Sequence, residues 1–131
     1  MKVTPDELQK MLSNELVKYV DEISEITKKA TDKVSKESLK ILKENAPVSD
    51  RKNKGKYKKA LSVTTQYEGK RNKRVVLYAK KPYYRLTHLL ENGHATRNGR
   101  RTKKVPHFQK AEEYADKTLT EEVIKGIEKI N

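Results

Sequence analysis

The three histidines are the first residues to consider as metal ligands or acid–base groups. His88 and His94 are six residues apart with Gly93 between them, and the nearest acid is Glu91. The 131-residue chain has no cysteine, so it offers neither a thiolate ligand nor a thiol nucleophile. A zinc site needs a short ligand pair with further supporting ligands, which this spacing does not supply. We therefore predict no metal and no cofactor, and we expect His88, His94 and His107 to be surface or capping residues.

Catalytic carboxylates and nucleophiles are equally sparse where a pocket would form. General acid–base catalysis needs two titratable groups held in one pocket. Glu68 and Glu91 are the only acids in residues 51–110, and no serine stands in a nucleophile-elbow context. The segment Gly93–Gly99 lacks the lysine spacing of a phosphate-binding loop. We predict no catalytic residues and no enzymatic activity, and a small hydrolase stays open only if Glu91 and the histidines share a metal.

The charge of the chain is concentrated in its middle section. The net charge is +13, and residues 51–110 hold 19 Lys and Arg against two acids, a net of +17. The two flanks together have a net charge of −4. Such a section attracts a polyanion, either nucleic acid or the acidic face of another protein. No zinc finger, helix-turn-helix or RNP-type aromatic pattern is present, so we favour protein docking, with non-sequence-specific nucleic-acid binding as the alternative.

Two basic segments are the predicted partner-binding sites. The first is the loop at residues 50–59, which carries six cations, and the second is the loop at residues 94–104. A flexible charged segment can become ordered against an oppositely charged partner. We expect Glu91, Gly93 and His94 to shape the root of the second loop, with Gly93 ending the preceding helix and Glu91 accepting hydrogen bonds from the loop. The residues predicted to contact a partner are Arg51, Lys52, Lys54, Lys56, Lys58, Lys59, Arg97, Arg100, Arg101, Lys103 and Lys104.

A long N-terminal helix is expected to position these segments. Thr4, Pro5 and Glu7 form a helix-start pattern, and apolar residues then recur every three or four positions up to Pro47. The pattern predicts a helix over residues 5–46, on the order of 60 Å long at about 1.5 Å per residue. Its apolar face is either a coiled-coil seam or the face that covers a sheet, and the drift of the spacing favours the second.

The remaining elements are predicted to be short except for the last. Alternating β-branched and aromatic residues on both sides of a turn predict a β-hairpin over residues 60–80. A short helix follows at residues 84–92, and apolar spacing then predicts a C-terminal helix over residues 106–130. The expected fold is α+β, a single domain over residues 1–131 in which a long N-terminal helix and a C-terminal helix pack on a small antiparallel β-sheet.

Neither a signal peptide nor a membrane segment is predicted. The first ten residues lack an apolar stretch after the basic residue. No apolar run approaches the roughly 20 residues that span a bilayer. The lack of cysteine suits a reducing compartment. We therefore expect the chain to have no membrane partner.

Three short segments occur in an order and spacing that match a known family. Ala46-Pro47-Val48 is followed by Gly55 and Lys59-Ala60-Leu61-Ser62, similar to A-P-V…T-G-x-L-x-x-S. The segment 83–94 is similar to Y-x-x-x-x-E-x-G-H/T, and the segment 105–112 is similar to x-P-H/F-x-x-P-A. The chain departs from the pattern where Lys110 replaces a proline and where Lys54-Gly55 replaces Thr-Gly. Over about residues 39–115 the chain thus resembles the tail-completion, or head–tail joining, proteins of long-tailed phages and prophages.

This resemblance implies a minor structural protein without enzymatic activity. Such proteins form a ring between the head-side connector and the end of the tail tube, or help to finish the tail before joining. The implied partners are phage connector and tail proteins and further copies of the chain, in a homo-oligomeric ring that a free monomer could precede. The implied location is the bacterial host cytoplasm during assembly and then the neck and tail of the virion.

Overall fold

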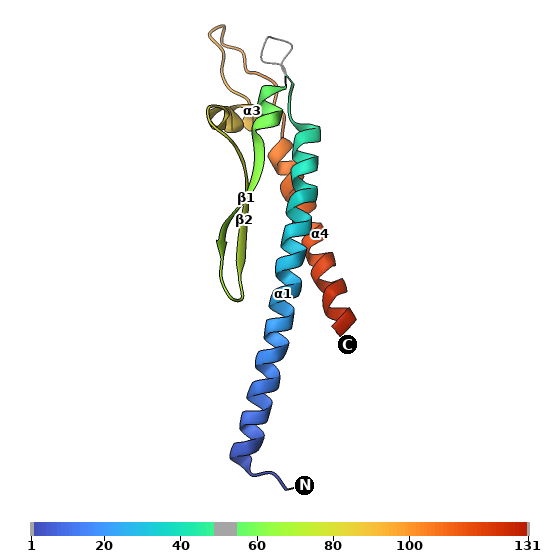
Figure 1. Ribbon diagram of the computed structural model, residues 1–131. Coiled ribbons are helices and arrows are strands. Elements are labelled where there is room, and N and C mark those ends of the chain that lie inside the picture. Colours follow the sequence, from blue (N-terminus) through green and yellow to red (C-terminus); the bar gives the residue numbers. More distant parts are fainter. Residues whose placement is uncertain (1, 49–54, 131) are drawn as a thin grey trace.

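The computed structural model describes residues 2–48 and 55–130, and one long helix runs through the whole molecule (Figure 1). Helix α1 spans Pro5–Asn45. Its N-terminus forms a capping box. The Thr4 hydroxyl accepts a hydrogen bond from the Glu7 backbone N–H, and the Glu7 carboxylate accepts one from the Thr4 backbone N–H, each at 3.2 Å. The helix ends because Ala46, which precedes a proline, has an extended backbone with φ −68° and ψ 141°.

A two-stranded antiparallel hairpin lies along one side of α1 (Figure 1). Strand β1 spans Leu61–Glu68 and strand β2 spans Lys73–Ala79, with an irregularity in the pairing after Thr65. The turn is fastened to the helix, since the Lys28 ammonium donates to the Gly69 carbonyl oxygen at 2.6 Å. A hairpin of two strands is marginal by itself, so α1 supplies the surface on which it is stable.

Helix α4 spans His107–Ile130 and packs antiparallel to α1, away from the hairpin (Figure 1). The hydrophobic core lies where α1, the start of α4 and the base of the hairpin meet. Its buried members are Leu42, Ala46, Tyr57, Leu61, Ala79 and Ala111. The predicted α+β fold, with a long N-terminal helix, a C-terminal helix and a small antiparallel sheet, is confirmed.

The end of the first basic segment differs from the loop that was expected. Residues Lys56–Ala60 form a short helix, α2, which begins at Gly55 with a positive φ of 77°. Tyr57 and Ala60 are buried in this helix. Two apolar positions among the lysines are therefore enough to hold the segment against the core.

The short helix expected at residues 84–92 is divided into two parts. Tyr83–Leu86 form one 3₁₀ turn, η1, and Thr87–Asn92 form helix α3. Helix α3 ends at Gly93, whose φ is 72°. Loop residues 94–104 then lead to α4, whose first residue is His107.

The first half of α1 extends beyond the other elements (Figure 1). All of residues 2–20 are exposed, and burial along the helix begins at Asp21. Within the described part of the chain, no helix is long and apolar enough to cross a membrane. Helix α1 therefore has one half that is packed between the hairpin and α4 and one half that nothing in the described chain covers.

Candidate partner-binding surfaces

A buried polar cluster fixes the roots of both basic segments. His107 is 0% exposed, and its Nε2 lies 2.7 Å from the Tyr57 hydroxyl. Its Nδ1 lies 2.8 Å from both the Val105 carbonyl oxygen and Glu91 Oε1. Because two acceptors face Nδ1, we assign the ring proton to Nδ1 and the donated Tyr57 hydrogen to Nε2. Burial raises the pKa of the Tyr57 hydroxyl, which keeps this donor protonated.

Glu91 also caps the start of α4. Its carboxylate accepts hydrogen bonds from the backbone N–H groups of Phe108 and, at 3.4 Å, of Gln109. N–H groups in the first turn of a helix have no intrahelical partner, and the helix dipole favours negative charge there. Glu91 was expected to accept hydrogen bonds from loop residues 94–104, but the backbone donors that it binds belong to α4. Glu91 therefore fixes the point at which the second basic loop enters α4.

The second basic loop begins at Gly93 and folds back on itself, so that its two arms lie antiparallel and hydrogen-bond to each other. The His94 and Thr102 backbones are joined by a 2.9 Å bond from Thr102 N–H to the His94 carbonyl oxygen, and Ala95 bridges to Arg101. The His94 N–H also donates to the Thr102 hydroxyl at 2.9 Å. A Cβ at Gly93 would lie 2.6 Å from the Thr102 carbonyl oxygen, so only glycine fits where the two arms of the loop converge.

The described parts of the two basic segments lie at one end of the molecule (Figure 1), and together they carry a group of eight cations. We call this group the cationic end. Arg51, Lys52 and Lys54 lie outside the described residues. Lys58 is half-buried and the other members are exposed, and none forms an ion pair with another residue of ranges 2–48 and 55–130. The members of the cationic end are Lys56, Lys58, Lys59, Arg97, Arg100, Arg101, Lys103 and Lys104.

Two cations at the hairpin turn differ from this group, because acids of α1 pair with them. Lys73 lies 2.6 Å from Asp32, and Arg71 lies 3.2 Å from Asp21. The hydrogen bond to Asp32 raises the pKa of Lys73. These pairs hold the hairpin on the helix, whereas the described cations of the cationic end form no ion pair with another described residue.

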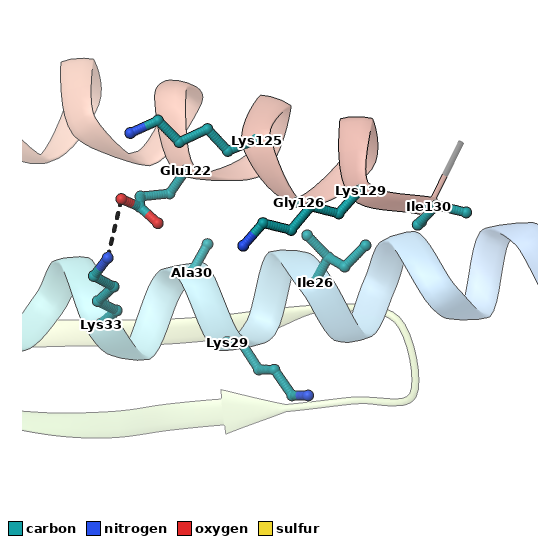
Figure 2. A pocket seen from close by; sticks show the side chains of 9 residues that line it. All are labelled: Ile26, Lys29, Ala30, Lys33, Glu122, Lys125, Gly126, Lys129 and Ile130. Atoms are coloured by element: carbon teal, nitrogen blue, oxygen red, sulfur yellow. Dashed lines mark hydrogen bonds and ion pairs between the residues drawn. The ribbon is translucent and has the colours of Figure 1, made fainter.

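A cleft of about 640 Å³ lies between α1 and the last turns of α4 (Figure 2). Its floor includes Ile26 and Gly126, where the helices approach so closely that a Cβ on Gly126 would lie 2.3 Å from Ile26 Cγ2. At its inner end the Lys33 ammonium donates to Glu122 at 3.1 Å. Figure 2 shows Lys129 extending between the two helices. The cleft thus combines an apolar floor with a basic opening.

The histidine prediction requires one correction. His88 and His94 are exposed, but His107, expected at the surface or as a cap, is buried in the core. Its burial depends on Tyr57, fifty residues earlier in the chain. Only the neighbouring Phe108 hinted at an apolar setting. Among residues 2–48 and 55–130, no three His, Cys, Asp or Glu side chains are grouped so that they could hold a metal ion.

A comparison with protein families assigns the chain. Residues 10–93, more than half of the chain, match the family described as "Bacteriophage HK97-gp10, putative tail-component". The matched part runs from the first turns of α1 through the hairpin to Gly93. Searches of curated proteins and of solved structures found no match. The chain therefore belongs to the HK97-gp10-like family of phage tail components.

Proposed function

We propose that this tail component completes the tail and joins it to the head-side connector, as a ring that acts through protein–protein contacts. Membership of a tail-component family supports a place in the virion among other phage structural proteins. The observation that carries the finer proposal is the cationic end. Its eight cations come from two segments far apart in sequence, and they have no ion-pair partner among the described residues.

Unpaired surface charge is suited to finding and orienting a partner. Complementary charge speeds encounter and fixes the register of a contact more than it adds raw affinity. The cluster of Tyr57, His107 and Glu91 holds the roots of both segments. Because these roots are already ordered, less conformational entropy remains to be lost when the cationic end docks on an acidic protein face.

The test is a binding assay with purified connector and tail-tube proteins of the same phage. The variant Arg97→Glu/Arg100→Glu/Arg101→Glu reverses three charges of the cationic end. The matched control Lys36→Glu/Lys40→Glu/Lys117→Glu makes the same change in net charge at exposed positions on the helices. We expect the first variant to lose binding and the joining of heads to tails, and the control to keep both. Equal loss in the two variants would contradict the proposal.

The same cations are the basis of the nucleic-acid alternative, and salt separates the two functions. Retention on DNA that disappears at moderate salt and shows no sequence preference is a consequence of charge alone. Binding to connector or tail-tube protein should persist at that salt concentration, because packed surfaces contribute to it. DNA binding that is tight and resists salt, with no protein binding, would favour the alternative.

A further inference from the structure

The free half of α1, residues 5–20, carries an apolar surface that nothing in the described chain covers. We call this segment the arm. Of the fourteen large hydrophobic residues that are exposed in the described chain, eight lie within residues 3–20. Leu12 and Leu16 are 56% and 64% exposed. Exposed apolar side chains that gather on one element mark an interaction site.

The apolar positions of the arm continue the stripe that the packed half of α1 buries. Leu8, Leu12, Leu16, Tyr19 and Ile23 are spaced by four, four, three and four residues. The same spacing continues at the buried residues Ala30, Val34 and Ser38. Ala30 and Ser38 lie at the contact with α4. An 11-residue repeat of this kind keeps one face along a nearly straight helix.

The arm and the α1–α4 cleft are complementary in charge. The arm carries Asp6, Glu7 and Glu15 against Lys10 and Lys18, a net charge of −1, and Glu15 lies 3.7 Å from Lys18. The cleft lining holds four lysines, Lys29, Lys33, Lys125 and Lys129, against one acid, Glu122, and Lys129 extends between the two helices (Figure 2). An apolar helix with a net negative charge therefore matches a cleft that has an apolar floor and a net positive lining.

We infer that the arm of one copy packs into the α1–α4 cleft of a second copy. The contact joins two different surfaces, so repetition from copy to copy closes a ring when the rotation is suitable. The inference deepens the proposed function, on whose ring assembly it rests. Pairing two arms with each other lacks this complementarity, because both arms carry the same net negative charge.

Cysteine cross-linking tests the contact directly, because the chain has no cysteine of its own. A differently tagged Glu15→Cys protein is mixed with Lys125→Cys protein under mild oxidation. Glu15 lies eleven residues before Ile26, about 16 Å along the helix, whereas a disulfide needs Cα atoms within about 7 Å. A bond between the two positions can therefore form only between copies. We expect the mixed dimer, and we expect little of it when Lys117→Cys, two turns further back on α4, replaces Lys125→Cys.

A second pair of variants measures the apolar part of the contact. Leu16→Glu places a charge on the stripe, whereas Asn14→Glu places the same charge on the opposite side of the arm, about 160° around the helix at about 100° per residue. Both positions are exposed, so neither change should alter the fold of one copy. We expect Leu16→Glu to weaken self-association, measured by sedimentation, roughly tenfold or more, and Asn14→Glu to leave it nearly unchanged.

The outcomes separate this inference from the proposed function. Binding to connector or tail-tube protein with no cross-link, in free protein and in assembled tails, would overturn the arm–cleft contact alone. A specific cross-link without such binding would overturn the joining role and keep the contact. Cross-linking of the arm to another phage protein in place of a second copy would also overturn the inference.

Discussion

The two halves of α1 have the same apolar spacing but different surroundings. Between Asp21 and Asn45 the helix lies between the hairpin and α4, and Leu42 is completely buried. Between Pro5 and Val20 every residue is exposed, with Leu12 56% exposed. Periodicity therefore shows that a helix will have an apolar face, but it does not show whether the chain itself covers that face. In a tail component, an uncovered face of this kind is available for contacts made on assembly.

The largest expected effect comes from shortening one leucine in each half. Leu42→Ala should lower the free energy of unfolding by about 2–5 kcal/mol, since a fully buried side chain is lost and a cavity remains. Leu12→Ala should change it by less than about 0.5 kcal/mol in the monomer. Denaturant unfolding at low protein concentration measures both. A similar loss at both positions would show that the arm is packed within one copy.

The next effect concerns the buried cluster beneath the cationic end. Tyr57→Phe removes the hydroxyl that lies 2.7 Å from His107 Nε2 and leaves that nitrogen buried without its donor. We expect a loss of about 1–3 kcal/mol in the free energy of unfolding. Tyr67→Phe is the matched control, because the Tyr67 side chain is exposed and its change should be close to zero. Equal stability of the two variants would mean that the cluster does not hold the segments in place.

The third effect compares alanine substitutions at two glycines of the second basic loop. Gly93 and Gly99 both have positive φ values, 72° and 76°, but only at Gly93 would a Cβ meet the chain, at 2.6 Å from the Thr102 carbonyl oxygen. Each alanine should cost about 1 kcal/mol or slightly more for the left-handed backbone. Gly93→Ala should cost more than Gly99→Ala and should also weaken partner binding, because it displaces the loop. Thermal unfolding and the connector-binding assay check the two effects.

The smallest effect is the pH dependence of the hairpin's attachment to α1. The Lys73 pKa is raised from 10.5, first by the hydrogen bond to Asp32. A raised pKa means that this contribution is complete below about pH 10.5 and is lost as the pH rises through the value in the folded state. The thermal midpoint should therefore fall more steeply above that pH in the natural protein than in Asp32→Asn. Parallel curves would show that the pair contributes nothing.

Elements specified by local sequence were predictable, and contacts between distant residues were not. The capping pattern at Thr4 and the proline after Ala46 predicted the bounds of α1 closely, because helix ends depend on a few adjacent residues. Helix α2 was missed because lysines surround its two buried residues. The sequence does not reveal the burial of His107, because this burial requires Tyr57 from a different element.

The surfaces themselves were predictable only in part. The high positive charge of the middle section was evident from composition. Which of its cations form ion pairs within the chain, and which do not, was not evident. Ion pairs with Asp32 and Asp21 bind the hairpin turn to α1, and these pairs depend on tertiary structure. The exposure of Leu16 was likewise hidden, since a helical pattern is the same for a buried face and an uncovered one.

The most direct test of the account is to locate the chain in assembled particles by electron cryo-microscopy. We expect a ring of copies at the junction of head and tail, with Arg97 and the rest of the cationic end against an acidic face of a neighbouring phage protein. A particle in which the chain lies elsewhere in the tail, or in which the cationic end faces solvent, would contradict the joining role.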